Sequence, residues 1–564
     1  MEFHLIISSI AQGLSPILLK KVLLILLLVN IPAYSDSTLP FSELMRTRLE
    51  QLSHAQSAFV GDRKIIASEL IADAYTRNGF QPLWNNPQNV QQFMELIRTT
   101  ADEGLNPDDY MLRYLTLRVA TDTDSTIKAV NRELLLSDAF FRLAYHYRFG
   151  KTNPKKLERT WNFRDGKDNI DPAGLLLQST QQNSVRISLQ QLLPTLPQYS
   201  ALRKGLQRYR SIAGNGGWAE IPAGGSLKKG MVNDRVAWLK SRLRATGDLA
   251  TGTSPDTNDF DGSLERAVYQ FQLRHGLQAD GIAGPETLAA MNIPVEQRIG
   301  QIRANMERLR WISRQLPEEY LLVDIAGFSV KQFSHGKENW STRAVVGKPF
   351  RATPVFRSSM THIVLNPSWT VPPTILAEDF LPQFRVDSSQ LKKKNLSVID
   401  NSGHEIDPAT VDWSSATRKN FKYQLRQRPG PGNALGRIKF MFPNDYFVYL
   451  HDTPSKNLFG SSSRAYSSGC IRIEKPLELA TLLLQKNNGW NYQRLLSELG
   501  NGQTRTIKLD WQIPVLLMYF TAEALDDNRI LFRNDLYNRD RTIIDALDQS
   551  LTHNASTDLA AWYR

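Results

Sequence analysis

The most informative segment of the sequence is Ser467-Ser468-Gly469-Cys470-Ile471-Arg472. Cys470 is the only cysteine in the chain of 564 residues. A nucleophilic thiol needs a base or a cation that favours its thiolate, and donors for the oxyanion that forms after attack. Gly469 lets a substrate approach the backbone because it has no Cβ. We therefore expect Gly469 and Ser468 to form the loop of a cysteine-based site, with a backbone amide as an oxyanion donor.

A histidine stands upstream of this stretch, at the end of the run Tyr446–Leu450, which predicts a strand. His451 alone would more often be structural, but its pairing with Cys470 across a Gly/Ser loop favours catalysis. Cysteine plus histidine, without a second cysteine or a carboxylate-rich cluster, favours acyl transfer, so we expect no metal site. A helix predicted from Pro476 would favour the thiolate if its positive end lies close. Arg472 either binds a substrate carboxylate or is solvated.

The N-terminus has the pattern of an export signal. Lys20 and Lys21 precede the apolar run Val22–Val29, and the small-residue triplet Ala33-Tyr34-Ser35 follows. Residues 1–35 are therefore predicted to be a signal peptide or an uncleaved anchor. Exported structural proteins use paired cysteines. A lone thiol is then more consistent with chemistry than with the alternative, a buried and inert side chain.

The formal net charge of +12 favours a polyanionic partner, either cell-wall polymer or nucleic acid. The chain has no basic helix and no stripe of alternating aromatic and basic residues, and it carries the export pattern. We therefore expect no nucleic acid partner.

Periodicity and turn signals predict a multidomain α+β protein. The predicted parts are a mostly helical segment 36–225, a compact helical unit 226–293, a linker helix 294–318, a β-rich domain 319–545 and a C-terminal tail 546–564. Within the β-rich domain, the polar and basic stretch at about 375–423 interrupts the strands. We interpret it as an insertion that is either a substrate lid or a solvated excursion.

The unit 226–293 contains three helical stripes separated by glycine signals. The strings Ala267–Gln272, His275–Leu277 and Asp280–Thr287 resemble the three-helix peptidoglycan-binding domain of cell-wall enzymes. The resemblance implies affinity for glycan strands or stem peptides. The alternative is a degenerate module that is kept for packing.

The sequence from His451 to Arg472 resembles the catalytic signature of the L,D-transpeptidase family (YkuD-type), in which a strand histidine precedes a Ser-x-Gly-Cys-aliphatic-Arg motif. The runs Val345–Pro349 and Asn366–Ile375 are also similar to that family. The whole layout resembles its long D branch, with a scaffold, a wall-binding module and a catalytic domain of β-sandwich-like architecture that carries a capping insertion.

The resemblance implies a peptidoglycan L,D-transpeptidase that forms 3→3 links between diaminopimelate residues. Cys470 would be the nucleophile and would release the terminal D-Ala of a tetrapeptide stem, with His451 as general base and acid. It implies no cofactor, and peptidoglycan as partner, with other cell-wall synthesis enzymes as further candidates. Carbapenems would be covalent inhibitors. The expected location is the periplasm of a Gram-negative bacterium. Two alternatives stay open: hydrolysis of the same bonds by an L,D-carboxypeptidase or endopeptidase, and a non-catalytic wall-binding scaffold.

Two departures from the family pattern affect the site. Ser468 stands where short members carry histidine, and Asp452 stands where they carry glycine. The group that orients His451 is therefore open among the Asp452 carboxylate, a nearby backbone carbonyl and neither. Tyr449 lies two residues before His451, and we predict that it contacts substrate, together with Arg472, Trp369 and Asp452.

Overall fold

The computed structural model describes residues 39–54, 58–118, 125–163, 170–250, 252 and 257–551. The chain divides into two compact units. The first combines residues 1–94, 111–141 and 171–185, and the second combines 95–110, 142–170 and 186–564. The predicted signal or anchor segment, 1–35, lies outside the described residues. No helix within the described ranges is long and apolar enough to cross a membrane.

The first unit is helical and has one small hairpin, β1 (Phe59–Val60) with β2 (Arg63–Lys64). Its helices include α3 (Phe41–His54), α4 (Ser68–Arg77), α6 (Leu112–Arg118), α9 (Pro172–Gln181) and the first part of α7 (Thr126–Phe149). A buried carboxylate, Glu133, accepts hydrogen bonds from the Tyr75 hydroxyl and from the Leu83 and Trp84 amides. Because this carboxylate is fully satisfied inside the core, it is structural.

In the second unit, α15 (Val295–Ile312) packs against α11 (Pro197–Gly214) and α21 (Arg539–Asp548). α15 lies within the range 294–318 for which a linker helix is predicted. Arg308 of α15 forms an ion pair with Asp540 of α21 at 2.6 Å, and both side chains are buried. The pair fixes α15 against α21, because a buried charge without its partner is costly.

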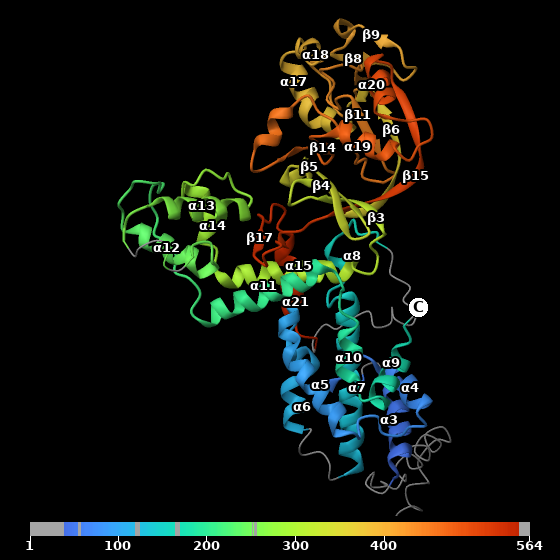
Figure 1. The fold of residues 1–564 in the computed structure, drawn as a ribbon. Coiled ribbons are helices and arrows are strands. Elements are labelled where there is room, and N and C mark those ends of the chain that lie inside the picture. Colours follow the sequence, from blue (N-terminus) through green and yellow to red (C-terminus); the bar gives the residue numbers. More distant parts are fainter. Residues whose placement is uncertain are drawn as a thin grey trace, which may run out of the picture. The chain divides into compact units, whose positions relative to one another are not determined.

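The three helices predicted for residues 226–293 are α12 (Arg235–Thr246), α13 (Gly262–Arg274) and α14 (Pro285–Met291), labelled in Figure 1. They enclose an apolar core that includes Leu239, Val268 and Phe271. The Gln272 side chain donates to Asp280 Oδ1 and Ile282 O and accepts from the Gly281 amide, with distances of 2.8, 2.9 and 2.8 Å. These motif residues therefore hold the turn between α13 and α14.

Of the candidate catalytic residues, His451 belongs to, and Cys470 directly precedes, a strand of a nine-stranded sheet of order β13-β5-β14-β12-β11-β6-β15-β3-β4. The strands are β3 (Glu319–Asp324), β4 (Ser329–Ser334), β5 (Lys337–Gly347), β6 (Phe356–Leu365), β11 (Ile438–Met441), β12 (Leu450–His451), β13 (Ala465–Ser467), β14 (Ile471–Ile473) and β15 (Arg505–Met518). β5 also pairs with β4, so the sheet closes on itself. Together with the helical parts, this confirms the predicted multidomain α+β class.

The strand predicted over Tyr446–Leu450 is wrong, because only Leu450 begins β12. Phe447 has φ +56°, a left-handed conformation that a strand does not contain. The Asn444 side chain bonds the backbone on both sides of the bend, accepting from the Tyr446 and Val448 amides and donating to Val448 O. These side-chain bonds replace the strand ladder.

The insertion is a folded subdomain, which we call the cap (Trp369–Gln427). Its four-stranded sheet has the order β7 (Trp369–Thr370), β10 (Gln424–Gln427), β8 (Leu396–Ile399) and β9 (Glu405–Ile406). The helices α16 (Pro373–Ile375), α17 (Leu381–Val386) and α18 (Gln390–Lys393) and the π-helical turn η5 (Leu376–Phe380) complete it. The cap has its own apolar core, which includes Phe384, Val398, Trp413 and Leu425. The alternative of a solvated excursion is therefore wrong.

Candidate active site

Cys470 ends a tight loop immediately before β14. β14 runs parallel to β12, with Leu450 opposite Ile471 and His451 opposite Arg472. The Ile471 amide donates to Tyr449 O at 3.1 Å, which extends the pairing to the level of Cys470. Paired residues share a face of a sheet, and so do residues two apart in a strand. Cys470 and His451 therefore lie on one face of neighbouring strands.

The same face carries a lysine that the sequence did not reveal. Lys439 of β11 lies directly opposite His451. Its Nζ is 3.9 Å from the centroid of the Tyr449 ring. The sequence shows Lys439 between two apolar residues, Ile438 and Phe440. In the structure these two are buried and Lys439 is half-buried. Only the strand register shows that Lys439 belongs to the face of the candidate nucleophile.

The loop before Cys470 is held by its own side chains. The Ser467 hydroxyl donates to Cys470 O at 2.6 Å and accepts from the Gly469 amide at 3.1 Å. The Thr353 hydroxyl donates to Gly469 O at 2.9 Å. Gly469 has φ +112°, which a side chain would strain. The Gly469 amide is thus engaged within the loop, whereas the Cys470 amide has no hydrogen-bond partner among the described residues.

Ser468 connects the loop to the cap. Its exposed hydroxyl accepts a hydrogen bond from Arg351 Nη1 at 2.9 Å. Arg351 lies in the short helix η4 (Pro349–Arg351) and forms ion pairs with Glu378 and Asp379 of η5, both at 2.7 Å. The position that carries histidine in short family members is therefore bonded, in this chain, to an arginine that also holds the cap.

His451 is buried, and its Nδ1 contacts the backbone carbonyl of Asp452. A carbonyl can only accept, so Nδ1 carries the proton and Nε2 is left as an acceptor. Burial, with repulsion from Arg472 and Lys439, lowers the pKa of His451 to about 3. The imidazole is therefore neutral near pH 7, as a general base must be before it acts.

The Asp452 carboxylate bonds groups other than the His451 ring. It accepts from the Arg437 amide at 2.9 Å and the Thr453 amide at 2.7 Å, and it pairs with Lys456 at 2.6 Å. Among the three candidates for the group that orients His451, the structure places the Asp452 backbone carbonyl there. The carboxylate instead bonds the residue that precedes β11 and the turn that follows β12.

The Cys470 thiol is half-buried and donates to Phe447 O at 3.6 Å. No hydrogen bond joins it to the His451 ring within the described part of the chain. Burial raises the pKa of Cys470, while hydrogen bonds from Tyr449 and the charges of Lys439 and Arg472 oppose that rise. In this conformation Cys470 is a neutral thiol beside a neutral imidazole, and the thiol must turn toward Nε2 before proton transfer.

Three family models match the chain. Residues 318–491 match the L,D-transpeptidase catalytic domain. This part of the chain is an L,D-transpeptidase catalytic domain. Residues 232–291 match the "Putative peptidoglycan binding domain", and residues 69–206 match a scaffold domain. The three matches follow the order of parts that the sequence predicts.

A curated protein of Haemophilus influenzae, named "Putative L,D-transpeptidase", is 36% identical over 245 residues, which are 43% of this chain and 48% of that protein. The chain thus spans about half the length of this curated relative. Solved L,D-transpeptidase structures from Xylanimonas cellulosilytica and Stackebrandtia nassauensis are 15% and 14% identical. They cover 53% and 52% of this chain and 99% and 97% of their own, with TM-scores of 0.16 and 0.20. Scores this low carry no inference about the present chain.

Two further side chains lie near Cys470, the candidate nucleophile of the L,D-transpeptidase domain. The Tyr449 hydroxyl interacts with both Cys470 and Trp369, and burial first, then the nearby Cys470, raises the Tyr449 pKa. Trp369 belongs to β7 of the cap and packs against Phe380 of η5, with ring centroids 6.2 Å apart. The cap therefore contributes one of its own aromatic side chains to the surroundings of Cys470.

Arg472 is half-buried on the face of Cys470. Its Nε is buried without a hydrogen-bond partner, and its guanidinium forms no ion pair within the described residues. Burial lowers its pKa. A desolvated, unpaired cation beside a nucleophile is suited to bind a ligand anion.

The helix predicted after Cys470 is present as α19 (Pro476–Leu484), but β14 separates it from the thiol. The condition for support of the thiolate, that the positive end of this helix lies close, is therefore not met, because that effect falls off within the first turn.

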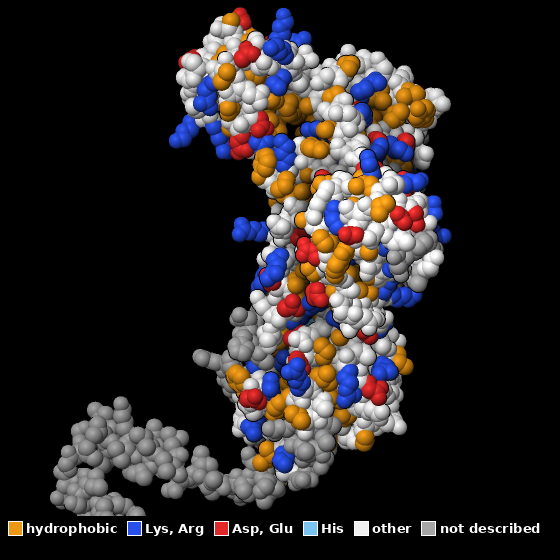
Figure 2. Space-filling view, turned by 90° about the vertical axis from the view of Figure 1, so that its left-hand side faces the viewer, with side chains coloured by type: hydrophobic (Ala, Val, Ile, Leu, Met, Phe, Trp, Pro, Cys, Tyr) orange, Lys and Arg blue, Asp and Glu red, His pale blue; other side chains and the backbone are white. Residues whose placement is uncertain are grey.

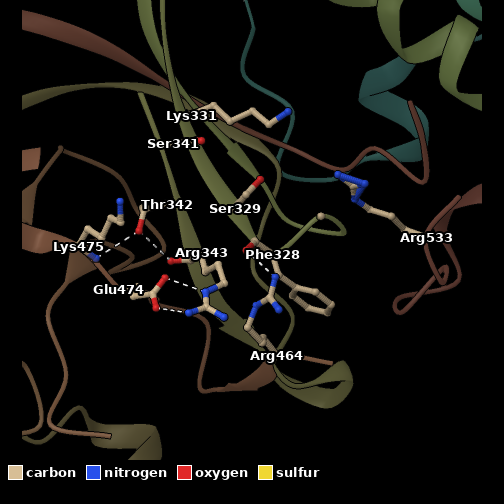
Figure 3. Close-up of a pocket in the computed structure, with 11 residues that line it drawn as sticks. Phe328, Ser329, Lys331, Ser341, Thr342, Arg343, Arg464, Glu474, Lys475 and Arg533 are labelled. Carbon is tan, nitrogen blue, oxygen red and sulfur yellow. Dashed lines mark hydrogen bonds and ion pairs between the residues drawn. The ribbon is translucent and has the colours of Figure 1, made fainter. Parts of the chain in front are cut away.

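A separate cavity of about 320 Å³ lies along β4 and β5 in the L,D-transpeptidase domain (Figure 3). Its cationic side chains are Lys331, Arg343, Arg464, Lys475 and Arg533. Four of them pair with acidic side chains, and Arg464 instead donates to Ala344 O, Ser461 O and Phe328 O. The cavity includes neither Cys470 nor His451, so it is separate from the candidate catalytic pair.

The face in Figure 2 shows lysine and arginine side chains distributed over all the parts in view, among acidic and apolar ones. This face shows no single basic stripe of the kind that follows a nucleic acid backbone.

Proposed function

We propose that the chain is a peptidoglycan L,D-transpeptidase that works through a Cys470 acyl-enzyme and forms 3→3 cross-links. The observation that carries the proposal is the placement of Cys470 and His451 on one face of neighbouring strands in a domain that matches this family. The peptidoglycan-binding match at residues 232–291 supports the same substrate.

In the acylation step, His451 Nε2 takes the thiol proton while the Cys470 sulfur attacks the carbonyl of the third stem residue, diaminopimelate. The Cys470 amide, which has no hydrogen-bond partner among the described residues, would donate to the oxyanion. When the tetrahedral intermediate collapses, the C–N bond to D-Ala breaks and the imidazolium returns its proton to the departing amine. The product is a thioester on Cys470.

In the second step, the side-chain amine of diaminopimelate from another stem attacks the thioester. His451 accepts a proton from this amine and returns it to the sulfur as the C–S bond breaks. Water in place of the amine gives a tripeptide, which is the hydrolytic alternative. The cap, whose Trp369 lies near Tyr449, is proposed to exclude water from the acyl-enzyme.

Substrate recognition is proposed for three side chains around the nucleophile. Arg472 would bind a stem carboxylate, because its guanidinium is desolvated and unpaired among the described residues. Tyr449 and Trp369 would contact the peptide. We further propose a periplasmic location in a Gram-negative bacterium and export by residues 1–35, cleaved or as an anchor, with other wall-synthesis enzymes as candidate partners.

Incubation with purified tetrapeptide muropeptides tests the acceptor. The proposal predicts 3→3 dimers together with free D-Ala, and neither product from Cys470→Ala. Tripeptide without any dimer would establish the hydrolase alternative.

Carbapenem acylation separates an enzyme from a wall-binding scaffold. We expect intact-mass analysis to show one adduct per chain on the unmodified protein and none on Cys470→Ala. A folded protein without an adduct would favour the scaffold.

A further inference from the structure

Lys439 is the one cationic residue of β11, and it pairs with His451, the candidate base, on the neighbouring strand β12. It lies directly opposite His451 in the antiparallel pairing of β11 with β12. Tyr449, two residues before His451, is its diagonal neighbour on the same face, which explains why the ammonium rests on the Tyr449 ring at 3.9 Å. The lysine is thus built into the face that carries Cys470.

The Lys439 ammonium is half-buried, and it has no carboxylate partner within the described residues. Burial lowers its pKa, and the nearby Cys470 raises it. Burying a cation without an anion is costly, so positions of this kind are retained where the charge serves a ligand or a reactive group. The ring of Tyr449 compensates part of the cost through a cation–π interaction.

Several groups face the Cys470 sulfur or its immediate neighbours, and their charges bear on its titration. Tyr449 and His451 come from β12, Arg472 from β14 and Lys439 from β11. His362 of β6 lies on the same face, diagonal to Lys439, which lowers its pKa further after burial. Arg351 bonds to Ser468, but it is compensated by Glu378 and Asp379.

Before proton transfer, His451 supplies no positive charge to the Cys470 sulfur, because its imidazole is neutral. Because burial disfavours the imidazolium that forms when His451 takes the thiol proton, further cations on the same face help to stabilise the thiolate. Both cations lie opposite His451 of β12. Arg472 is on β14, on one side of β12, and Lys439 is on β11, on the other side.

We propose that Lys439 is a positioning residue that holds the Tyr449 hydroxyl against the Cys470 sulfur and stabilises the thiolate by its charge. The proposal rests on Cys470 as the nucleophile of the proposed function. It adds β11 to the strands that contribute residues to the site. Lys439 acts through Tyr449 and through space, and it makes no covalent step of its own.

Alkylation of Cys470 by iodoacetamide tests this directly, because the chain contains no other thiol. The thiolate displaces iodide, a C–S bond forms, and the thiol proton goes to buffer. The rate against pH, followed by intact mass on the full-length protein, gives an apparent pKa. For Lys439→Met we expect this pKa to rise and alkylation at pH 7 to slow about three- to tenfold, the ratio that corresponds to half to one pKa unit.

Two variants control the measurement. Lys439→Arg keeps a cation over the Tyr449 ring, and we expect it to restore most of the wild-type rate. Lys508→Met removes the same charge from β15, four strand positions from β14, and we expect it to leave the profile unchanged. Lys439→Gln replaces Lys439→Met if the latter shows a lowered melting temperature.

A Lys439→Met or Lys439→Gln profile that superimposes on the wild type would overturn the proposal. This includes the case in which only the KM for muropeptide rises, since Lys439 would then bind substrate. The readout needs no wall substrate, so a chain without transpeptidase activity can still show the shift. Failure of the proposed function and failure of the Lys439 role are therefore distinguishable.

Discussion

At the scale of single residues, the candidate site is a neutral thiol and a neutral imidazole near two cations, Arg472 and Lys439. His451 keeps its Nδ1 proton on the Asp452 carbonyl and its pKa near 3, while the Cys470 thiol rests on Phe447 O. Proton transfer must therefore accompany attack, because no thiolate–imidazolium pair is present beforehand. Phe447 holds its carbonyl there in a strained conformation, with φ +56° and a side chain that is 84% exposed.

This arrangement predicts the pH dependence of Cys470 alkylation. A preformed ion pair would lower the pKa of the thiol far below its usual value, so alkylation would be fast and nearly independent of pH around neutrality. Because His451 stays neutral above about pH 3 and burial raises the pKa of Cys470, we expect instead a rate that rises with pH toward the alkaline range, without a plateau between pH 5 and 7.5. A plateau that is present in the wild type and absent in His451→Gln would contradict this expectation.

At the scale of elements, the sheet brings together residues that are far apart in sequence, and the cap is bonded to the nucleophile loop. Arg351 is the joint, since one guanidinium bonds Ser468, Glu378 and Asp379. The cap can be held in this way because it is a folded body with its own core around Phe384 and Trp413.

Removal of the Arg351 guanidinium should make both the nucleophile loop and the η5 segment of the cap less rigid. In Arg351→Met we expect amide exchange of residues 376–380 and 467–470 to speed up about two- to tenfold, the effect of losing partly exposed ion pairs. Arg343→Met breaks a different ion pair, with Glu474, and serves as the matched control. Unchanged exchange in both segments would show that Arg351 does not connect them.

The cap core makes a separate prediction about stability. Phe384 is buried against Trp413, with ring centroids 5.5 Å apart. Phe384→Ala removes this packing, and we expect it to cost about 3–5 kcal/mol of the free energy of unfolding of the cap. Limited proteolysis would then cut within residues 381–425 in the variant. Cleavage outside the cap instead would mean that the insertion does not fold as one body.

At the scale of the whole molecule, much of the account could be read from the sequence, because the informative residues are local. The three helices predicted for residues 226–293 and the motif around Cys470 each lie in one short stretch. Lys439 and Arg351 could not be found in this way, since the first needs the strand register and the second needs the cap in place. Tyr446–Leu450 failed as a strand because Asn444 bonds the backbone there.

The family matches place a scaffold domain, a putative peptidoglycan-binding domain and a catalytic domain in one chain. We propose that such a chain binds the polymer on which its catalytic domain is proposed to act. The proposed transpeptidation, however, depends on one covalent bond to Cys470.

Intact-mass analysis of the protein quenched in acid during reaction with a tetrapeptide stem tests that bond most directly. The account predicts one added tripeptidyl group per chain, absent in Cys470→Ala and formed at least tenfold more slowly in His451→Ala, consistent with the loss of a general base. An unmodified wild-type protein under turnover, or an adduct that survives in Cys470→Ala, would contradict it.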